Sequence, residues 1–157
     1  MLKKYLPVCL NLESKKVLVI GAGGVACQKL KTLLSCGARV TVIAPQAALP
    51  IQRWSLAKKI ILKPRRFKAC DIHSYHVVYA CTDDSKLNRS IRSLAKEQHI
   101  LCNITDNPKG SDFISPAVLK KKNILIAVSS FGRNPRQSVQ IRNQIKAMGN
   151  RHGSFFK

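Results

Sequence analysis

Acidic residues are scarce in this chain of 157 residues, which has 7 Asp and Glu against 28 Lys and Arg and a formal net charge of +21. Such a balance favours anionic partners, and a general basic bias of solvated faces explains it equally well. The basic residues form only short clusters, and only 6% of the residues are aromatic, so a stacking platform for single strands is not evident. No recognised nucleic-acid module is present. A nucleic-acid partner is therefore not expected, although the charge alone does not exclude one.

Long apolar runs and paired cysteines are also lacking. No run reaches the ~18 apolar residues that a membrane span needs, and residues 1–7 lack a signal-peptide core, so we expect a cytoplasmic chain with no membrane partner. None of the six cysteines forms a CxxC pair or lies at zinc-site spacing from one of the four histidines. The sequence therefore predicts reduced, mostly buried thiols and no metal ligand.

The most informative segment is a glycine-rich turn near the start of the chain. Four apolar residues at 17–20 predict a buried strand, Gly21, Gly23 and Gly24 predict a tight turn, and a helical pattern runs from residue 25 to 36 with Gly37 placed to end it. A strand, a glycine turn and a helix in this order are the context that a dinucleotide-binding fingerprint requires. A plain strand–helix turn without a ligand is the alternative interpretation.

Each small residue of this turn has a distinct expected role in holding NAD. Gly21 permits the turn, Gly23 lets a pyrophosphate approach the backbone, and Ala26 lets the helix pack closely on the strand. Gly24 completes the turn and Val25 begins the helix, whose free N–H groups and partial positive charge favour phosphate.

The second predicted strand, at residues 38–44, departs from the fingerprint. It should end in Asp or Glu to hold the adenosine ribose, but it is followed by Pro45 and Gln46. Gln46 can bond a ribose hydroxyl without repelling a 2′-phosphate. The choice of NAD over NADP is therefore not fixed by charge.

The alternation of strand and helix patterns predicts an α/β fold, a Rossmann-like parallel sheet followed by a small strand–strand–helix segment. The first part has strands expected at 17–20, 39–43, 60–62, 76–81 and 100–104, and helices at 25–36, 48–58 and 85–98. The second part has strands expected at 113–119 and 124–129, joined by the basic turn 120–123, and a helix at 135–148. We expect an NAD-binding domain over 1–112, a dimerisation and substrate-pocket segment over 113–149, and a tail over 150–157.

Polar residues follow two of the predicted strands. Thr82, Asp83 and Asp84 are N-cap candidates for the helix that follows them. Asp106 follows the last strand of the sheet, where open α/β sheets bind ligands and where a dehydrogenation needs a proton acceptor. Taken alone, Asp106 before Asn107 and Pro108 is more typical of a turn-forming residue.

Taken together, motifs along residues 5 to about 147 resemble the precorrin-2 dehydrogenase, or siroheme-synthase N-terminal, family. The matching motifs in the first part of the chain are 5–7 (YLP), 10–12 (LNL), 16–26 (KVLVIGAGGVA) with Lys29, Leu33 and Leu34, and 37–45 (GARVTVIAP). Those in the later part are 80–84 (ACTDD) with Asn88, 102–106 (CNITD), 112–113 (DF), 116–117 (PA) and 126–130 (IAVSS). Their order and number make the combination far more specific than any single motif.

The resemblance implies an NAD-dependent oxidation of precorrin-2 to sirohydrochlorin on the route to sirohaem, and some family members also insert iron into the product. Family members are usually homodimers whose segment after the Rossmann part builds the interface. The competing hypothesis is a basic Rossmann module that senses NAD or binds a polyanion such as nucleic acid and has lost catalysis.

The resemblance also assigns roles to individual residues. Asp106 matches the key carboxylate of an Asn-x-x-Asp pattern that begins at Asn103, and Asn103 is an expected substrate-binding residue. Thr82 and Asp83 match nicotinamide-side contacts. Ser129 and Ser130 match a serine pair near the tetrapyrrole pocket. The family usually continues with Gly-Gly-x-Ser-Pro, where residues 131–135 read FGRNP, and Arg133 in this stretch is expected to pair with a substrate carboxylate.

Overall fold

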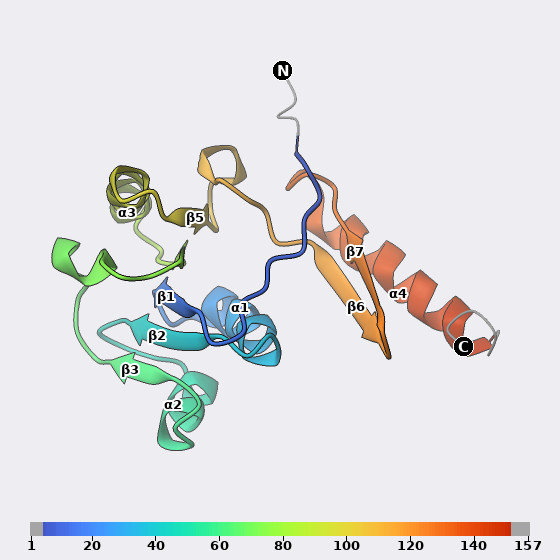
Figure 1. Cartoon of the computed structure of the whole chain (residues 1–157), viewed down its shortest axis with the longest axis horizontal. Helices are drawn as coiled ribbons and strands as arrows, with labels where there is room; N and C mark the ends of the chain where they lie inside the picture. Colours follow the sequence, from blue (N-terminus) through green and yellow to red (C-terminus); the bar gives the residue numbers. More distant parts are fainter. Residues whose placement is uncertain (1–4, 152–157) are drawn as a thin grey trace. The chain divides into compact units, whose positions relative to one another are not determined.

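The computed structural model describes residues 5–151 and divides after Phe113 into two compact units. The first unit contains five parallel strands in the order β3-β2-β1-β4-β5 (Figure 1). Their bounds are β1 Lys16–Ile20, β2 Arg39–Ile43, β3 Ile61–Lys63, β4 Val77–Ala80 and β5 Leu101–Ile104. The predicted Rossmann-like sheet is confirmed.

Helices cover the two faces of this sheet unequally. The helices are α1 Gly24–Ser35, α2 Leu49–Leu56 and α3 Ser85–Glu97, with short 3₁₀ turns η1 Ala69–Ile72 and η2 Pro108–Gly110. One apolar cluster joins the sheet to α1 and α2, and a second joins the opposite face to α3 and η1. Strand residues such as Val17, Leu18 and Val19 are completely buried because both faces are covered at the centre of the sheet. The link from β3 to β4 contains η1 but no α-helix.

Local signals explain where two of these helices begin and end. Gly37 adopts φ +71° directly after α1, and Ala38 donates its N–H to the carbonyl of Leu33, which closes the helix as glycine in this position commonly does. Asp84 caps α3, since its carboxylate accepts the N–H groups of Lys86 and Leu87 at 2.8 and 3.0 Å. These bonds lower the pKa of Asp84 below its usual range. Of the expected N-cap candidates, Asp84 fills the role.

The second unit consists of an antiparallel pair, β6 Ala117–Lys121 and β7 Ile124–Val128, and helix α4 Pro135–Arg151. The expected start of β6 at residue 113 is wrong. Phe113 belongs to the first unit, where its ring packs edge-on against Tyr79 at 5.5 Å and its carbonyl accepts the Asn103 amide. Pro116 has no N–H to give to a ladder, so pairing begins after it.

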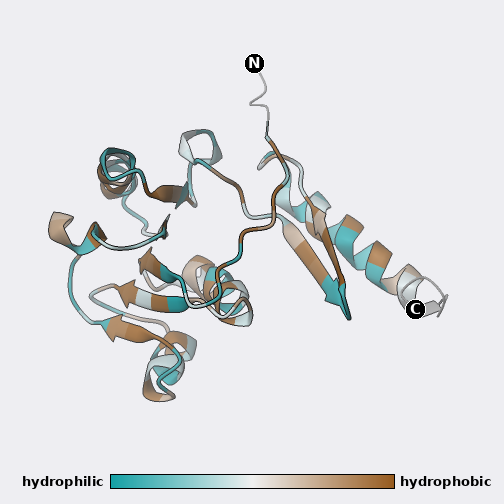
Figure 2. Cartoon of the chain, in the orientation of Figure 1, coloured by the Kyte–Doolittle hydropathy of each residue, from teal (hydrophilic) through white to brown (hydrophobic). Residues whose placement is uncertain are grey.

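The second unit buries little of its apolar surface. Leu119 is its one buried hydrophobic side chain among the residues that the structure describes. Leu125 of β7 and Met148 of α4 are 51% and 58% exposed. In Figure 2, α4 alternates between hydrophobic and hydrophilic segments, which is typical of a helix with one face available for packing.

The expectation of mostly buried thiols is wrong. Only Cys81 and Cys102 are buried, both in the sheet region, while Cys27 is half-buried and Cys9, Cys36 and Cys70 are exposed. Cys36 is the C-cap of α1 and Cys70 lies in the 3₁₀ turn η1, positions at which the chain meets solvent. Within residues 5–151, no helix combines the length and apolarity that crossing a bilayer demands.

One ion pair closes the loop between β3 and η1 and leads to a pH prediction. Arg65 donates to both carboxylate oxygens of Asp71 at 2.7 and 2.5 Å, and the Asp71 side chain is 7% exposed. The hydrogen bond from Arg65 lowers the pKa of Asp71 to about 2. Because the folded-state pKa is depressed, this carboxylate stabilises the fold above its unfolded pKa of about 4, and the contribution disappears as the pH falls towards 2.

We therefore expect Asp71→Asn to lower the free energy of unfolding at pH 7 and to lose less stability than the wild type on acidification. Urea denaturation of both proteins at pH 7, 5, 3 and 2 measures this. The difference between their free energies of unfolding should narrow below pH 4. A constant difference in the free energy of unfolding down to pH 2 would contradict stabilisation by the charged pair.

Candidate cofactor and catalytic site

The glycine turn lies at the carboxyl end of β1, between two neighbouring strands. Gly21 adopts φ +100°, and its N–H donates to the carbonyl of Ile43 at the end of β2. A Cβ on Gly21 would overlap the carbonyl of Cys81, which follows β4. Gly21 is thus required both by its backbone conformation and by the close approach of the β4 end.

Open space surrounds the next two glycines. A Cβ added to Gly23 or Gly24 meets no heavy atom within 4 Å, and both residues are exposed. Gly23 is the N-cap of α1 and has no side chain to occupy its first turn, so the first N–H groups of the helix face an open site. Val25 is 49% exposed there, while Ala26 is fully buried against the sheet as its expected packing role requires. This cradle suits a pyrophosphate group.

Other expected cofactor residues occupy the same edge of the sheet. Pro45 and Gln46 are exposed shortly after the end of β2, next to the strand that leads into the glycine turn. Thr82 is half-buried after β4, and its hydroxyl donates to the side-chain oxygen of Asn88 at 2.7 Å. Asp83 is exposed beside it. The carboxyl ends of β1, β2 and β4 therefore gather these residues on one edge, where parallel sheets bind ligands.

Asp106 is exposed after β5, and its carboxylate is held from two sides. One oxygen accepts the Ser85 hydroxyl at 2.7 Å and the other accepts the Asn88 amide at 3.1 Å. Asn88 is completely buried and its amide also donates to the carbonyl of Thr82, so it links the ends of β4 and β5. The turn-forming bond belongs to the neighbouring Asn107, whose side chain accepts the N–H of Gly110.

Asp112, the other acidic residue of this region, has a structural environment. One of its oxygens accepts the backbone N–H of Cys102 in β5 at 2.9 Å, and the other pairs with the Arg92 guanidinium. Asn103 in turn is 5% exposed, and its amide donates to the carbonyl of Phe113 at 2.8 Å. The side-chain amide of Asn103 is therefore hydrogen-bonded to the backbone within the first unit.

Ser129, Ser130 and Arg133 belong to the second unit, in the link from β7 to α4. The hydroxyl oxygens of the two serines accept the N–H groups of Phe131 and Asn134 at 3.1 and 2.9 Å, which shapes a tight turn. Arg133 is exposed on this turn. The serine pair and Arg133 are therefore close to each other, in a different unit from the glycine turn and Asp106.

Two ionisable groups near the glycine turn in sequence or register are withdrawn from water, half-buried Lys29 and buried Cys81. Burial lowers the pKa of Lys29 in α1, and it raises the pKa of the Cys81 thiol to about 12. Cys81 is therefore a neutral thiol at physiological pH and no nucleophile. Within the described part of the chain, no three His, Cys, Asp or Glu side chains lie close enough together to hold a metal ion.

Ser85 and Asn88 were not among the predicted site residues. Their signal is the spacing Ser85-x-x-Asn88 in the first turn of the helix after β4, which brings both side chains towards the end of the neighbouring strand β5. Sequence reasoning treated this turn as a helix cap, and only the family motif included Asn88.

Three comparisons relate this geometry to known proteins. The family model described as "Putative NAD(P)-binding" matches residues 8–117. The siroheme synthase of Nitrosococcus oceani is 37% identical over 145 residues, which are 92% of this chain and 31% of that protein. The siroheme synthase of Methylococcus capsulatus is 37% identical over 142 residues, 90% of this chain and 30% of that protein. This chain therefore spans about a third of the length of these curated relatives.

A solved structure shares the fold. The protein titled "SirC, precorrin-2 dehydrogenase" superposes with a TM-score of 0.77 at 23% identity, over 92% of this chain and 71% of that one. The resemblance expected from the motifs is confirmed by these relatives. Since the family model covers most of the first unit, including the glycine turn and Asp106, this chain belongs to the family of putative NAD(P)-binding domains.

Proposed function

We propose that this chain is an NAD-dependent dehydrogenase that oxidises precorrin-2 to sirohydrochlorin in sirohaem biosynthesis. The observation that carries the proposal is the 37% identity to a siroheme synthase over 92% of this chain. The fold shared with a protein titled precorrin-2 dehydrogenase supports it. The cytoplasmic location and iron insertion stay predictions from the sequence and from the resemblance.

The residues at the carboxyl edge of the sheet fit a bound dinucleotide. Gly23, Gly24 and Val25 would hold the pyrophosphate at the open first turn of α1, and Gln46 would bond a ribose hydroxyl. Thr82 and Asp83 would line the nicotinamide side. NAD, when bound, supplies the acceptor for a hydride from the tetrapyrrole.

Asp106 is the proposed general base. The oxidation removes a hydride from one atom of the substrate and a proton from another, so the protein must supply a proton acceptor. Asp106 is exposed, and the bonds from Ser85 and Asn88 fix the direction of its carboxylate. A carboxylate held in one orientation is a better acceptor than a mobile one because less reorganisation precedes proton transfer.

The second unit would supply contacts to the substrate. Precorrin-2 carries several carboxylates, which suit the strongly basic chain. Arg133 is exposed and can form a paired bond with one of them, next to the turn that Ser129 and Ser130 shape. Asn103 contributes mainly by positioning, since its amide is already bonded to Phe113.

The decisive experiment mixes the purified chain with precorrin-2 and NAD and follows the absorbance of sirohydrochlorin and of NADH. The proposal expects both to rise together. Binding of NAD without turnover, accompanied by salt-dependent binding of duplex DNA, would instead support a basic Rossmann module that has lost catalysis.

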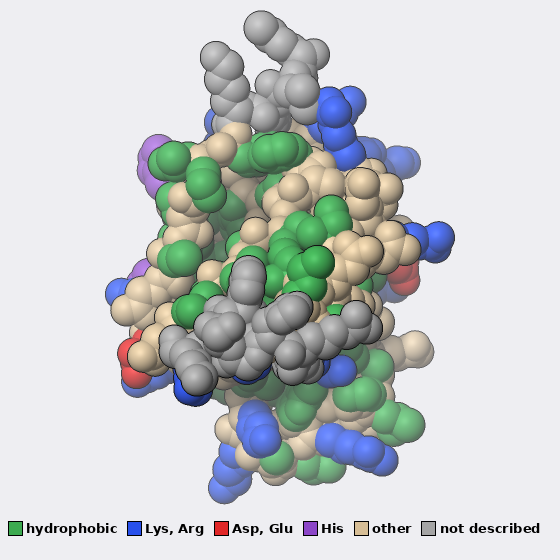
Figure 3. All heavy atoms as spheres, turned by 90° about the vertical axis from the view of Figure 1, so that its right-hand side faces the viewer, with side chains coloured by type: hydrophobic (Ala, Val, Ile, Leu, Met, Phe, Trp, Pro, Cys, Tyr) green, Lys and Arg blue, Asp and Glu red, His purple; other side chains and the backbone are tan. Residues whose placement is uncertain are grey.

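We also propose that the second unit, residues 114–149, forms a homodimer interface. Two short strands and one helix rarely bury enough apolar surface alone, and here Leu125, Val139 and Met148 remain exposed. Hydrophobic side chains are visible at the surface in Figure 3, among many basic and few acidic ones.

Sedimentation equilibrium should therefore show a dimer for the wild type and a monomer for Leu125→Glu, because a charge in an apolar interface is costly to desolvate. Leu56→Glu is the matched control, since Leu56 lies on α2 of the first unit and is 84% exposed. It should leave the dimer intact. A wild-type monomer at every accessible concentration would refute the interface.

A further inference from the structure

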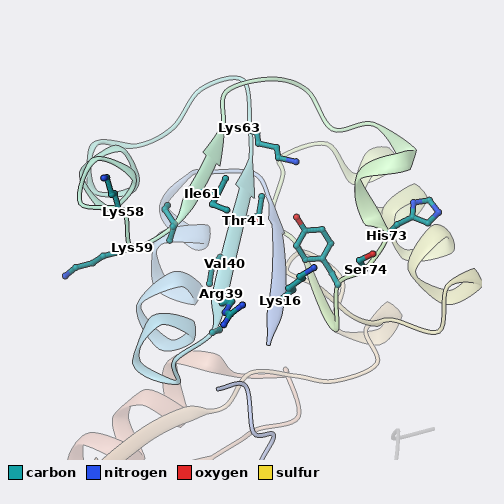
Figure 4. Close-up of a pocket in the computed structure, with 13 residues that line it drawn as sticks. Lys16, Arg39, Val40, Thr41, Lys58, Lys59, Ile61, Lys63, His73 and Ser74 are labelled. Atoms are coloured by element: carbon teal, nitrogen blue, oxygen red, sulfur yellow. The ribbon is translucent and has the colours of Figure 1, made fainter. Parts of the chain in front are cut away.

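A basic cavity of about 590 Å³ lies on the first unit and is lined by the amino ends of β1 and β2 and by β3 (Figure 4). One wall is the sheet, from β1 to β3, and the other is the segment His73–Tyr75 that follows η1. The residues that line it include Lys16, Arg39 and Lys63. Nothing in the proposed dehydrogenation uses this cavity.

Strand register explains why these charges share one face. Lys16 pairs with Arg39 across β1 and β2, and Thr41 pairs with Ile61 across β2 and β3. Side chains two residues apart on a strand point the same way, so Lys16, Arg39, Thr41, Ile61 and Lys63 all project from the same side of the sheet. Figure 4 shows this side facing His73 and Ser74, while Lys59 points away from it.

The short link between β3 and β4 leaves this face open. On the opposite face, α1 and α2 cover β1 and β2, but here the link contains only η1, four residues long. Ile61 consequently remains 62% exposed on the sheet. A right-handed crossover in such sheets usually carries a helix that would fill this volume.

The charges in the cavity are not neutralised by the protein. No Asp or Glu lines it. Within the described part of the chain, the side chains of Lys16 and Arg39 make no ion pair or hydrogen bond. Asp71 is near Lys63, but Arg65 occupies both of its carboxylate oxygens. Uncompensated like charges in a concave, partly apolar site favour an anion.

We propose that this cavity binds a small molecule that carries at least two linked phosphate groups. Lys16 and Arg39 are register partners on neighbouring strands, whose backbones lie about 4.8 Å apart, and Arg offers a planar fork to phosphate, so two linked phosphates can contact both side chains. The volume lies within the usual range of small-molecule sites, about 300–1,000 Å³. Tyr75 is the one Phe, Trp or Tyr in its lining, which suits a compact ligand better than a nucleic-acid strand.

The Lys16 and Arg39 end of this cavity is distinct from the cofactor cradle, although Lys63 ends β3 at the carboxyl edge of the sheet. Lys16 begins β1 and the glycine turn follows its last residue, Ile20, so the two lie roughly 13 Å apart along the strand. The inference does not depend on the proposed dehydrogenation, because binding of a phosphate probe requires neither NAD nor a tetrapyrrole.

Titration of the isotope-labelled chain with inorganic pyrophosphate, followed by NMR, tests the proposal. In a Gly23→Asp background, which blocks the cofactor cradle, pyrophosphate should still bind saturably and shift the amide signals of Lys16, Arg39 and residues 73–75. The double variant Lys16→Gln/Arg39→Gln should weaken binding by at least about 10-fold, since it removes two charged donors.

The matched control is Lys31→Gln/Lys96→Gln, which removes the same charge from exposed helix positions outside the cavity. It should weaken binding less than about twofold, a change that long-range screening allows. Equal weakening by both double variants would overturn the proposal in favour of non-specific attraction. If the Gly23→Asp protein bound no pyrophosphate at all, the pyrophosphate site would be the glycine turn and the proposal would be overturned. Binding of duplex DNA but not of pyrophosphate through Lys16 and Arg39 would also overturn it.

Discussion

Asp106→Asn is expected to lower the rate of dehydrogenation by about 10² to 10⁴, the usual contribution of a positioned general base. The asparagine keeps the shape of the side chain. Its amide oxygen can accept the bond from Asn88, which donates to the carboxylate at 3.1 Å, and its amide N–H can donate to the Ser85 hydroxyl oxygen, which lies 2.7 Å from the carboxylate. The negative charge and the ability to take a proton are removed. Steady-state kinetics with precorrin-2 and NAD measure the loss, and calorimetry with NAD should show unchanged cofactor affinity.

Asp112→Asn is the matched control for this experiment. Asp112 lies six residues further along the chain and its carboxylate accepts the N–H of Cys102 and pairs with Arg92, so its replacement should lower the melting temperature. The activity per folded molecule should stay close to that of the wild type. Full activity in Asp106→Asn would show that another group accepts the proton. A loss of activity confined to Asp112→Asn would show that Asp112, and not Asp106, is the base.

Gly23→Asp should abolish NAD binding while the protein stays folded. The structure offers space for the new side chain, because a Cβ on Gly23 meets no heavy atom within 4 Å. Its carboxylate would then occupy the open first turn of α1 and repel the pyrophosphate. Calorimetric titration with NAD measures the affinity, and circular dichroism verifies the fold.

Gly21→Ala, two residues away, should behave in the opposite manner. The alanine would sit at φ +100° and its Cβ would overlap the Cys81 carbonyl, so we expect a loss of about 3 kcal/mol or more in the free energy of unfolding. Thermal denaturation distinguishes the two variants. A folded Gly23→Asp protein with unchanged NAD affinity would contradict the fingerprint role of the turn.

Local sequence signals were sufficient to predict the first unit. The apolar run at 17–20 has no polar break and leads into three glycines, so strand, turn and helix follow from residues that are adjacent in the chain. Gly37 ends α1 as predicted because its φ of +71° favours glycine. The parallel direction of the strands follows from the same alternation, since a crossover connection joins parallel strands.

Features that depend on distant contacts were not predictable in this way. The start of β6 shifts because Phe113 packs on Tyr79, a residue far away in the sequence. The bonds of Ser85 and Asn88 to Asp106 require the neighbouring order of β4 and β5. The open basic face arises because one crossover lacks an α-helix, which no single residue of Lys16, Arg39 or Lys63 signals.

The unequal burial of the six thiols gives this protein a built-in reporter of its own opening. Cys9, Cys36 and Cys70 are exposed and accessible to an alkylating reagent in the native state, whereas Cys81 and Cys102 are buried after β4 and within β5. Burial raises the pKa of both buried thiols to about 12, so almost no thiolate is available there until the sheet separates. The labelling rate of these two cysteines, resolved by mass spectrometry, therefore reports how readily β4 and β5 open, without any engineered probe.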